Sequence, residues 1–308
     1  MIELFARSSA MREVVDLAER VSATDSNLLI TGESGSGKDL IASYIHSLSR
    51  RANGPYVKID CATLPADLLE AELFGYERGA FTGAAEMKPG RFEAAKEGTI
   101  VLDEVAHLPN DSQAKLLRVI ESREFERLGG RTTLKLDARL IALTNVELEH
   151  AVERGAFRED LFYRLNVIHI RVPPLRDRRE DVKKLAGYFQ TLYSRKHGST
   201  VKGISAAALE LLLAYDFPGN ARELANLVER AVIVASGKWI ETADWPATVI
   251  EGITARKRIE KPLSLAELEA EHIAKVLLVS NGNKTECARI LGISRKNLYE
   301  KIAKYKLD

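Results

Sequence analysis

Short runs of apolar and β-branched residues alternate with helix-patterned stretches through the first half of the chain. The runs lie at residues 28–31, 56–59, 99–102, 140–144 and 167–172. Strands buried on both faces read as continuous apolar runs, whereas strands with one solvated face alternate. The pattern therefore predicts a mostly parallel sheet covered by helices, in an α/β domain over residues 1–174.

The strand pattern ends at Pro173-Pro174. From there to about Ser236, apolar residues recur at helical spacing and strand-like runs are absent from the sequence. This predicts a second, all-helical domain over residues 175–245.

The rest of the chain has the pattern of a linker followed by a small helical domain. Residues 246–263 are the expected linker, because the stretch from Glu251 to Lys261 is rich in basic side chains and poor in residues that can pack. A capping box, Ser264-Leu265-Ala266-Glu267, then opens a helical pattern. Two short helices follow, broken at Gly292, so residues 264–308 are expected to form a third domain.

Composition narrows the possible functions. The formal net charge is only +1, so nucleic-acid contacts are to be sought in local clusters. Cys61 and Cys287 are far apart and lack metal-ligand spacing, which argues against a disulfide framework or a zinc site. The N-terminus has no signal-peptide pattern and no apolar run reaches membrane-spanning length, so the sequence predicts a cytoplasmic protein without membrane contact.

The clearest chemical motif is the glycine-rich segment at residues 32–38. It follows the first predicted strand and precedes a helical pattern. This is the context of a phosphate-binding loop, in which backbone N–H groups hold the phosphates and Lys38 reaches their outer oxygens. Asp39 stands where Ser or Thr often supplies a hydroxyl to Mg²⁺, so that ion must use other oxygens. With ATP and Mg²⁺ as ligands, the predicted cofactor-binding set is Gly32, Glu33, Ser34, Gly35, Ser36, Gly37, Lys38 and Asp39.

Two carboxylates, Asp103 and Glu104, end the apolar run at 99–102. The ends of strands carry function in open α/β sheets. We expect Asp103 to hold Mg²⁺ directly or through water, and Glu104 to polarise the water that attacks the γ-phosphate. Two solvated acids at a strand end are the alternative, which the presence of Lys38 disfavours.

Three further residues are candidates for the same chemistry. Asn145, after the fourth predicted strand, is expected to orient the attacking water or contact the γ-phosphate. Arg158 and Arg164 lie six residues apart, a spacing that does not align them on one helical face. We therefore expect different roles or an intervening bend, while a surface salt bridge is the simpler interpretation of either arginine alone.

The hexapeptide Gly79-Ala80-Phe81-Thr82-Gly83-Ala84 lies between the two halves of this site. Its glycines free the backbone, and few side chains surround its one aromatic residue. We expect Phe81 and Thr82 at an exposed loop tip, available to a partner and moved by the nucleotide. A turn whose Phe81 folds back onto the core is the alternative.

Residues 283–299 combine a short helix, a glycine-containing turn and a Ser-capped second helix, which is the order of a helix-turn-helix. In the last helix Leu298, Ile302 and Tyr305 are expected to face the core. A solvated basic face is the alternative to DNA binding. The predicted DNA-binding set is Lys284, Thr285, Ser294, Arg295, Lys296, Asn297 and Lys301.

With these residues identified, the chain resembles the bacterial enhancer-binding proteins, the sigma-54-dependent transcriptional activators among the AAA+ ATPases. The resemblance covers nearly the whole sequence. Its most specific element is the hexapeptide at 79–84, which in that family engages the sigma-54 RNA polymerase holoenzyme. The implied fold is an AAA+ α/β domain, a helical lid and a Fis-type helix-turn-helix domain.

The resemblance also implies roles for single residues. Asn145 matches the first sensor and Arg222 the second, which adds Arg222 to the nucleotide-binding set, while Arg158 and Arg164 match arginine fingers supplied to a neighbouring subunit. Arginines that act in trans imply a hexameric or heptameric ring. The Fis-type domain implies dimers paired through the helix at about 265–279, on double-stranded enhancer DNA.

The sequence departs from the family at three positions. At Ala6, near the nucleotide-facing N-terminal segment, the family commonly has Gly, so no adenine contact is assigned there. After the lysine of the phosphate-binding loop the family usually has Glu, whereas this chain has Asp39, which keeps the carboxylate and is a mild change. Asp60 stands where the family usually has an Asn that pairs with the catalytic glutamate until the partner is engaged, so the coupling role of Asp60 is open. No regulatory domain precedes the ATPase segment in this sequence, and we expect regulation by a separate protein or by a segment outside it.

The predicted function is that of a transcriptional activator whose ring hydrolyses ATP to remodel the sigma-54 closed promoter complex. A DNA-binding regulator that uses ATP only to set its assembly is the second hypothesis. That regulator could dispense with Glu104, the arginine fingers and the intact hexapeptide, all of which are present. A helicase or clamp-loader-type ATPase is the third hypothesis, and it would need neither the hexapeptide nor a sequence-reading helix-turn-helix.

Overall fold

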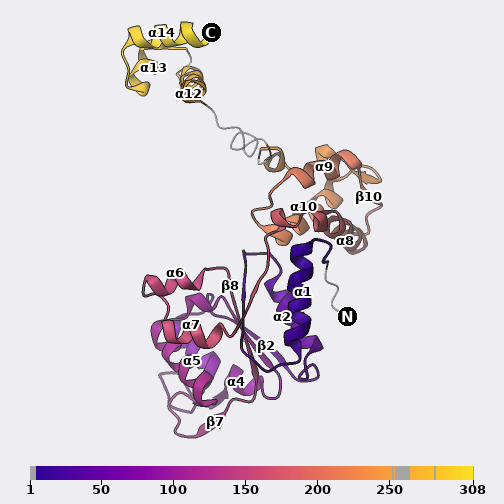
Figure 1. Ribbon diagram of the computed structural model, residues 1–308, viewed down its shortest axis with the longest axis vertical. Coiled ribbons are helices and arrows are strands. Elements are labelled where there is room, and N and C mark those ends of the chain that lie inside the picture. The colour runs from indigo at the N-terminus through magenta and orange to yellow at the C-terminus, as the bar shows by residue number, and fades with distance from the viewer. Residues whose placement is uncertain (1–4, 252, 254–263, 281, 308) are drawn as a thin grey trace. The chain divides into compact units, whose positions relative to one another are not determined.

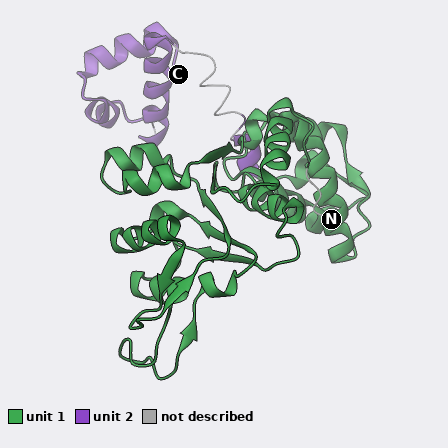
Figure 2. Ribbon diagram, turned by 60° about the horizontal axis from the view of Figure 1, so that its bottom comes forward, with its two compact units in different colours: residues 1–246 green, residues 247–308 purple. Residues whose placement is uncertain are grey.

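The structure is a computed structural model that describes residues 5–251, 253, 264–280 and 282–307. It divides into two compact units, residues 1–246 and 247–308 (Figure 2). Within the described residues, none of the helices combines the length and the apolar character that a membrane crossing needs.

A five-stranded parallel sheet with the strand order β2-β5-β8-β1-β9 lies at the centre of the first unit. All five predicted strands are confirmed, each to within one residue at either end. Since neighbouring parallel strands run in the same direction, the carboxyl ends of β1, β5 and β8 share one edge of the sheet. The strand bounds are β1 Leu28–Thr31, β2 Tyr56–Asp60, β5 Thr99–Asp103, β8 Arg139–Thr144 and β9 Ile168–Arg171.

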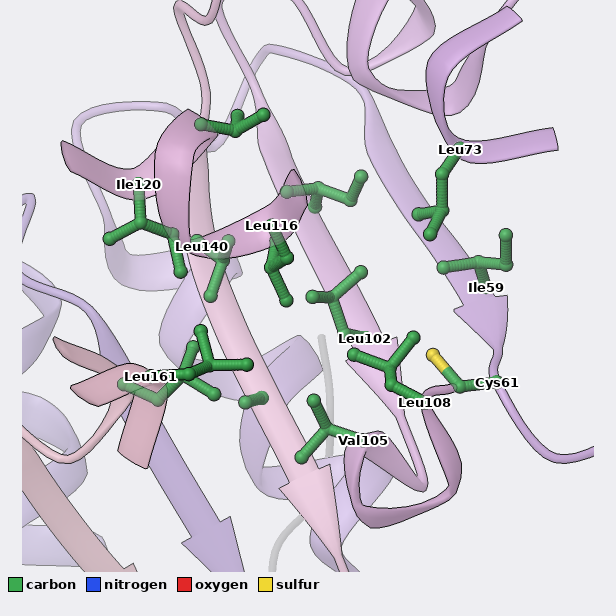
Figure 3. Close-up of a cluster of buried hydrophobic side chains, with 14 of the residues drawn as sticks. Ile59, Cys61, Leu73, Leu102, Val105, Leu108, Leu116, Ile120, Leu140 and Leu161 are labelled. Atoms are coloured by element: carbon green, nitrogen blue, oxygen red, sulfur yellow. The ribbon is translucent and has the colours of Figure 1, made fainter. Parts of the chain in front are cut away.

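Helices cover both faces of this sheet (Figure 1). On one face, alternate strand residues such as Leu102 and Leu140 pack against Leu116 of α5 (Figure 3). On the other face, Val101 and Ile141 pack with residues of α1 and α2. The continuous apolar runs are thus explained by burial on both sides. The covering helices are α1 Ser9–Ser22, α2 Lys38–Leu48, α3 Ala66–Phe74, α4 Arg91–Ala94, α5 Asn110–Ser122, α6 Leu148–Glu153 and α7 Glu159–Leu165.

Two short antiparallel pairs, which the sequence pattern did not predict, flank the hexapeptide. Gly75–Tyr76 (β3) pairs with Lys88–Pro89 (β4), so residues 79–84 lie in the connection between the two strands. Glu124–Glu126 (β6) pairs with Thr133–Lys135 (β7). Strands of two or three residues are too short to show an alternating pattern.

The rest of the first unit is mainly helical, with α8 Arg179–His197, α9 Ala206–Ala214 and α10 Asn220–Val234. The expectation that strands end at Pro173-Pro174 is wrong in one detail, because Gly203–Ile204 (β10) and Trp239–Ile240 (β11) form a parallel pair.

The expected linker, residues 246–263, is described only at its beginning. Residues 247–251 are helical, and Val249 among them is buried. Val249 and the neighbouring Ile250 are apolar residues that indicate a packed segment at the start of the expected linker. The basic composition of the rest of the stretch made this indication hard to see. Residues 254–263 lie outside the described part of the chain.

From residue 264 onward, the described part of the second unit contains the helices α12 Leu265–Val279, α13 Lys284–Leu291 and α14 Arg295–Tyr305. The predicted capping box is present, since Ser264 Oγ accepts the N–H of Glu267 and the Glu267 carboxylate accepts the N–H of Ser264. Gly292 ends α13 in the left-handed conformation (φ +64°), which favours glycine.

Candidate functional site

The phosphate-binding loop connects β1 to α2. Gly35 has φ +74°, and a Cβ built on it would lie 2.4 Å from the carbonyl oxygen of Gly219, so only glycine fits there. Gly37 precedes α2 with φ +108° and offers no capping side chain. The first N–H groups of α2 therefore lack a side-chain cap, which suits the phosphate that the sequence analysis expects there.

Lys38 begins α2 and is 7% exposed. Its ammonium donates to the carbonyl oxygens of Gly32, at 2.8 Å, and Glu33, at 3.3 Å. Burial lowers the pKa of Lys38 from its usual value, and the charges of Glu104 and Asp103 oppose that shift. The predicted lysine and the predicted acids thus belong to one site.

Asp103 and Glu104 stand at the end of β5, with Asn145 just after β8, the adjacent strand. Asp103 Oδ1 accepts the backbone N–H of Glu104 at 3.0 Å. Glu104 has left-handed backbone angles, φ +53° and ψ +47°, and its Oε2 accepts the backbone N–H of Asn145 at 3.1 Å. The end of β8 therefore orients the carboxylate that is predicted to activate water.

Lys58 of β2 belongs to this site and was missed by sequence reasoning. Its ammonium lies 2.7 Å from Asp103 Oδ2 and also contacts the carboxylate of Asp39. The available signal was a lysine inside an otherwise apolar predicted strand, close to the strand's carboxyl end. Burial opposes ionisation of Lys58, but hydrogen bonds to Asp103 and Asp39 outweigh it, and the pKa of Lys58 is raised.

Asp60 ends β2 opposite Asp103 in the sheet register. Its Oδ1 accepts the backbone N–H of Ala62 at 2.8 Å, so the carboxylate supports the turn that follows the strand. The pKa of the neighbouring Cys61 thiol reflects the negative charges at this edge of the sheet. Burial, followed by the charges of Asp60, Asp103 and Glu104, raises the pKa of the Cys61 thiol to about 12.

The oxygen donors of this edge suit Mg²⁺. Asp39 and Asp103 already hold one cationic group, the Lys58 ammonium, between them. Mg²⁺ is commonly held by one or two carboxylates together with nucleotide phosphates. Within the described residues there is no group of three His, Cys, Asp or Glu side chains that could hold a metal.

The helical part of the unit contacts the phosphate-binding loop through the start of α10. The Arg222 guanidinium donates to Ser34 Oγ at 2.9 Å, and the N–H of Ala221 donates to the carbonyl oxygen of Gly35 at 3.0 Å. The residue predicted as second sensor is therefore placed against the loop.

Asn220, which the sequence analysis did not single out, joins three segments. It is fully buried with φ +54°, its Oδ1 accepts the N–H of Leu175 at 2.7 Å, and its Nδ2 donates to Glu33 Oε2 and to the Ser34 carbonyl oxygen, each at 3.0 Å. Arg176 pairs with the same Glu33, and these bonds lower the pKa of Glu33, that to Arg176 most. The available sequence signal was the turn-forming stretch Pro218-Gly219-Asn220, because asparagine tolerates the left-handed conformation.

A cleft of about 910 Å³ adjoins this loop. Its lining includes Gly32 and Glu33 of the loop, Asn145 after β8, and Val14 and Leu17 of α1. The size suits a ligand as large as a nucleotide.

Arg158 and Arg164 stand at opposite ends of α7, Arg158 as the residue before the helix and Arg164 in its last turn. Arg158 pairs with Asp160 at 2.7 Å and Arg164 with Glu121 at 3.2 Å. Both arginine side chains are exposed. Exposed pairs of this kind are worth little and exchange readily.

The hexapeptide forms a closed loop. Gly79 donates its N–H to the carbonyl oxygen of Ala84 at 2.8 Å, and Gly79 and Gly83 have positive φ. Phe81 is 43% exposed, yet its ring meets that of Tyr76 edge-on with the centroids 4.9 Å apart. The loop thus falls between the two sequence expectations, because the tip is accessible while its aromatic ring has one local neighbour.

The foot of the loop is fixed by Arg127, which the sequence analysis also missed. Its guanidinium pairs with Glu77 at 2.8 Å and with Glu93 at 2.6 Å. These two carboxylates, Glu93 first, raise the pKa of Arg127. Nearby, Gly129 lies so close to Ala80 that a Cβ on Gly129 would be 2.8 Å from the Ala80 Cβ.

In the second unit, Leu298, Ile302 and Tyr305 contribute to the core, as predicted. Ser294 caps α14 by accepting the N–H of Asn297. Thr285, Ser294, Arg295, Lys296 and Asn297 are exposed, and Lys284 is half-buried.

Lys301 differs from the rest of the predicted DNA-binding set. Its ammonium pairs with Glu269 of α12, and Tyr305 donates its hydroxyl to the same carboxylate at 2.6 Å. This arrangement depends on how α12 packs on α14, which helical periodicity alone does not reveal.

Comparison with known proteins divides the chain into three matched segments. Residues 4–171 match the model of the sigma-54 interaction domain, residues 176–261 that of the AAA+ ATPase lid domain, and residues 264–305 that of the Fis family of bacterial regulatory proteins.

Curated relatives and solved structures extend the likeness over nearly the whole chain. Regulatory protein AtoC of Escherichia coli K12 is 45% identical, over 99% of this chain and 68% of the relative. Transcriptional regulatory protein FlbD of Caulobacter vibrioides is 42% identical, over 98% and 70%. The structure of NtrX from Brucella abortus in complex with ADP has a TM-score of 0.76 at 35% identity, over 99% of this chain and 69% of that one, and its ATP complex has 0.75 at 36%, over 98% and 69%.

Proposed function

The chain belongs to the sigma-54 interaction domain family, and on that premise we propose that it is an activator that hydrolyses ATP to remodel sigma-54 RNA polymerase bound at a promoter. One observation carries the proposal. A phosphate-binding loop, a lysine and a pair of acids meet at one edge of the sheet, in the same domain that holds the closed loop at residues 79–84.

The proposed division of labour follows the contacts at this edge. The glycine loop and the N-terminus of α2 bind the phosphates, and Lys38 turns from the loop carbonyls to the outer phosphate oxygens. Glu104, held by the N–H of Asn145, accepts the proton of the attacking water. Asp39 and Asp103 would hold Mg²⁺, which when bound neutralises charge on the phosphate oxygens.

Coupling to the polymerase is proposed to pass through the hexapeptide. Its foot is tied by Arg127 to Glu77 and Glu93, and its tip presents Phe81. An anchored base with an accessible aromatic tip supports transmission of movement from the nucleotide site to a partner.

A ring assembly is proposed to complete the site. Arg158 and Arg164 are exposed and held only by surface pairs, so either can be given to the nucleotide of a neighbouring subunit. An arginine supplied in this way can be worth about a thousandfold or more in rate.

The second unit is proposed to bind double-stranded enhancer DNA as a dimer. The exposed start of α14, with Arg295, Lys296 and Asn297, supports entry into the major groove. Leu265, Leu278 and Val279 of α12 are each more than three quarters exposed, which supports pairing of two copies through α12.

The alternative, a DNA-binding regulator without remodelling activity, is separated by one experiment. Open-complex formation by sigma-54 holoenzyme on an enhancer template should require ATP and fail with a non-hydrolysable analogue. Phe81→Ala should abolish it while most ATPase activity remains. Leu192→Ala, which alters a side chain of the same 43% exposure on α8, is the matched control and should behave as wild type. Equal open-complex formation with both nucleotides would contradict the proposal.

A further inference from the structure

We propose that Lys58 is a positioning residue that holds Asp39 and Asp103 together and competes with Mg²⁺ for their carboxylates. This inference rests on the proposed function, because it concerns how the site takes up the ion that accompanies the nucleotide. It adds a second residue of β2 to the site, besides Asp60 at the end of that strand.

The geometry that carries the inference joins three elements. Lys58 comes from β2, Asp103 from the end of β5 and Asp39 from the first turn of α2. The ammonium contacts both carboxylates, that of Asp103 at 2.7 Å. An ammonium has three donors, so one group can serve both acids at once.

The partial burial of the Lys58–Asp103 pair strengthens the attraction that Mg²⁺ has to overcome. The Asp103 side chain is only 15% exposed and that of Lys58 is 36% exposed, so water screens their attraction less than on an open surface. Without Lys58, the two carboxylates would lose the ammonium that contacts both, and the charge of Lys38 would remain as a weaker partner. A divalent cation entering the site must therefore displace the ammonium or share the oxygens with it.

Lys115 provides the contrast. Among the described residues its ammonium pairs with Glu70 alone, and the Glu70 side chain is 16% exposed, close to the value for Asp103. That pair links α5 to α3 and includes neither the phosphate-binding loop nor the acids of β5. Removing Lys115 thus deletes a comparable ion pair without touching the carboxylates that would hold Mg²⁺.

The test is the Mg²⁺ dependence of nucleotide binding, which needs no hydrolysis. ADP bearing a fluorescent N-methylanthraniloyl group is titrated with free Mg²⁺ on the full chain. In Lys58→Met, which keeps the aliphatic stem and removes the charge, the Mg²⁺ concentration for half-maximal binding should fall about tenfold, equivalent to about 1.4 kcal/mol. Lys58→Gln should shift it in the same direction, and provides the measurement if the Met variant does not fold.

Two control variants test whether the effect comes from the charge of Lys58 in this site. Lys58→Arg keeps a bridging cation and Lys115→Met keeps the site, so both should remain within about twofold of wild type. In a second readout, Mn²⁺ binding without nucleotide, followed by electron paramagnetic resonance, should be tighter in Lys58→Met than in wild type.

The outcomes separate this inference from the proposed function. A half-saturating Mg²⁺ concentration that is unchanged or higher in both neutral variants would overturn the role of Lys58, while the wild-type protein would still be an ATPase. Failure of the wild-type protein to bind the fluorescent ADP at any Mg²⁺ concentration would overturn the proposed function and this inference with it.

Discussion

Exchanging Glu104 for Gln should stop hydrolysis and leave nucleotide binding intact. Glu104 Oε2 accepts the backbone N–H of Asn145 at 3.1 Å, and the carbonyl oxygen of a Gln side chain can accept the same bond. The exchange thus preserves size and this contact. What it removes is the capacity to take a proton from water.

The expected loss follows from that single function. General-base assistance is typically worth about a hundredfold or more, which corresponds to about 2.7 kcal/mol in barrier. The phosphate-binding loop and Lys38 are untouched, so the Kd of a fluorescent ATP analogue should stay within about threefold of wild type.

Steady-state ATP hydrolysis and equilibrium binding, measured on the same preparation, provide the check. Glu153→Gln, which neutralises an exposed acid at the end of α6, is the control for the loss of one negative charge. A Glu104→Gln rate within about tenfold of wild type would refute the assignment of Glu104 as the general base.

Four further outcomes are expected. Lys38→Ala should abolish nucleotide binding itself, so a normal Kd would contradict its role. Asp60→Asn keeps an oxygen for the N–H of Ala62 and should retain ATPase activity within about tenfold, or about 1.4 kcal/mol, whereas a hundredfold loss would mean that the carboxylate takes part in the chemistry. Arg295→Ala should weaken binding to the specific DNA site, and a purely phosphate contact would lower the salt slope by about one; an unchanged footprint would exclude the contact. Burial lowers the pKa of His46 in the folded protein, so as the pH falls the unfolded chain takes up a proton at this residue first. The free energy of unfolding should therefore decrease as the pH falls from about 6.5 through the folded pKa. Thermal melts of His46→Gln should depend less on pH in that range.

The parts of the fold that sequence could predict are those with a strong local signal. The five buried strands have continuous apolar runs, and the caps of α12 and α14 have the residues that cap helices. The phosphate-binding loop and the acids after β5 were found because each motif lies within a few consecutive residues.

The missed features depend on residues that only the fold brings together. Lys58 of β2 meets Asp39 in the first turn of α2, and Arg127, just after β6, meets Glu77, just after β3, and Glu93 of α4. Likewise, the pairing of Lys301 with Glu269 joins two helices. Such pairs leave no periodicity in the sequence, because each partner alone is an ordinary charged residue.

The backbone of Glu104 places a limit on how stable this protein can become while remaining an enzyme. Its φ of +53° lies in the left-handed region, which Asn and Gly occupy readily and which costs other residues about 1 kcal/mol. Glu104→Asn or Glu104→Gly would therefore relieve the backbone and raise the melting temperature. Both changes discard the carboxylate that is proposed to activate water. Selection for heat resistance and selection for turnover thus favour different residues at this position.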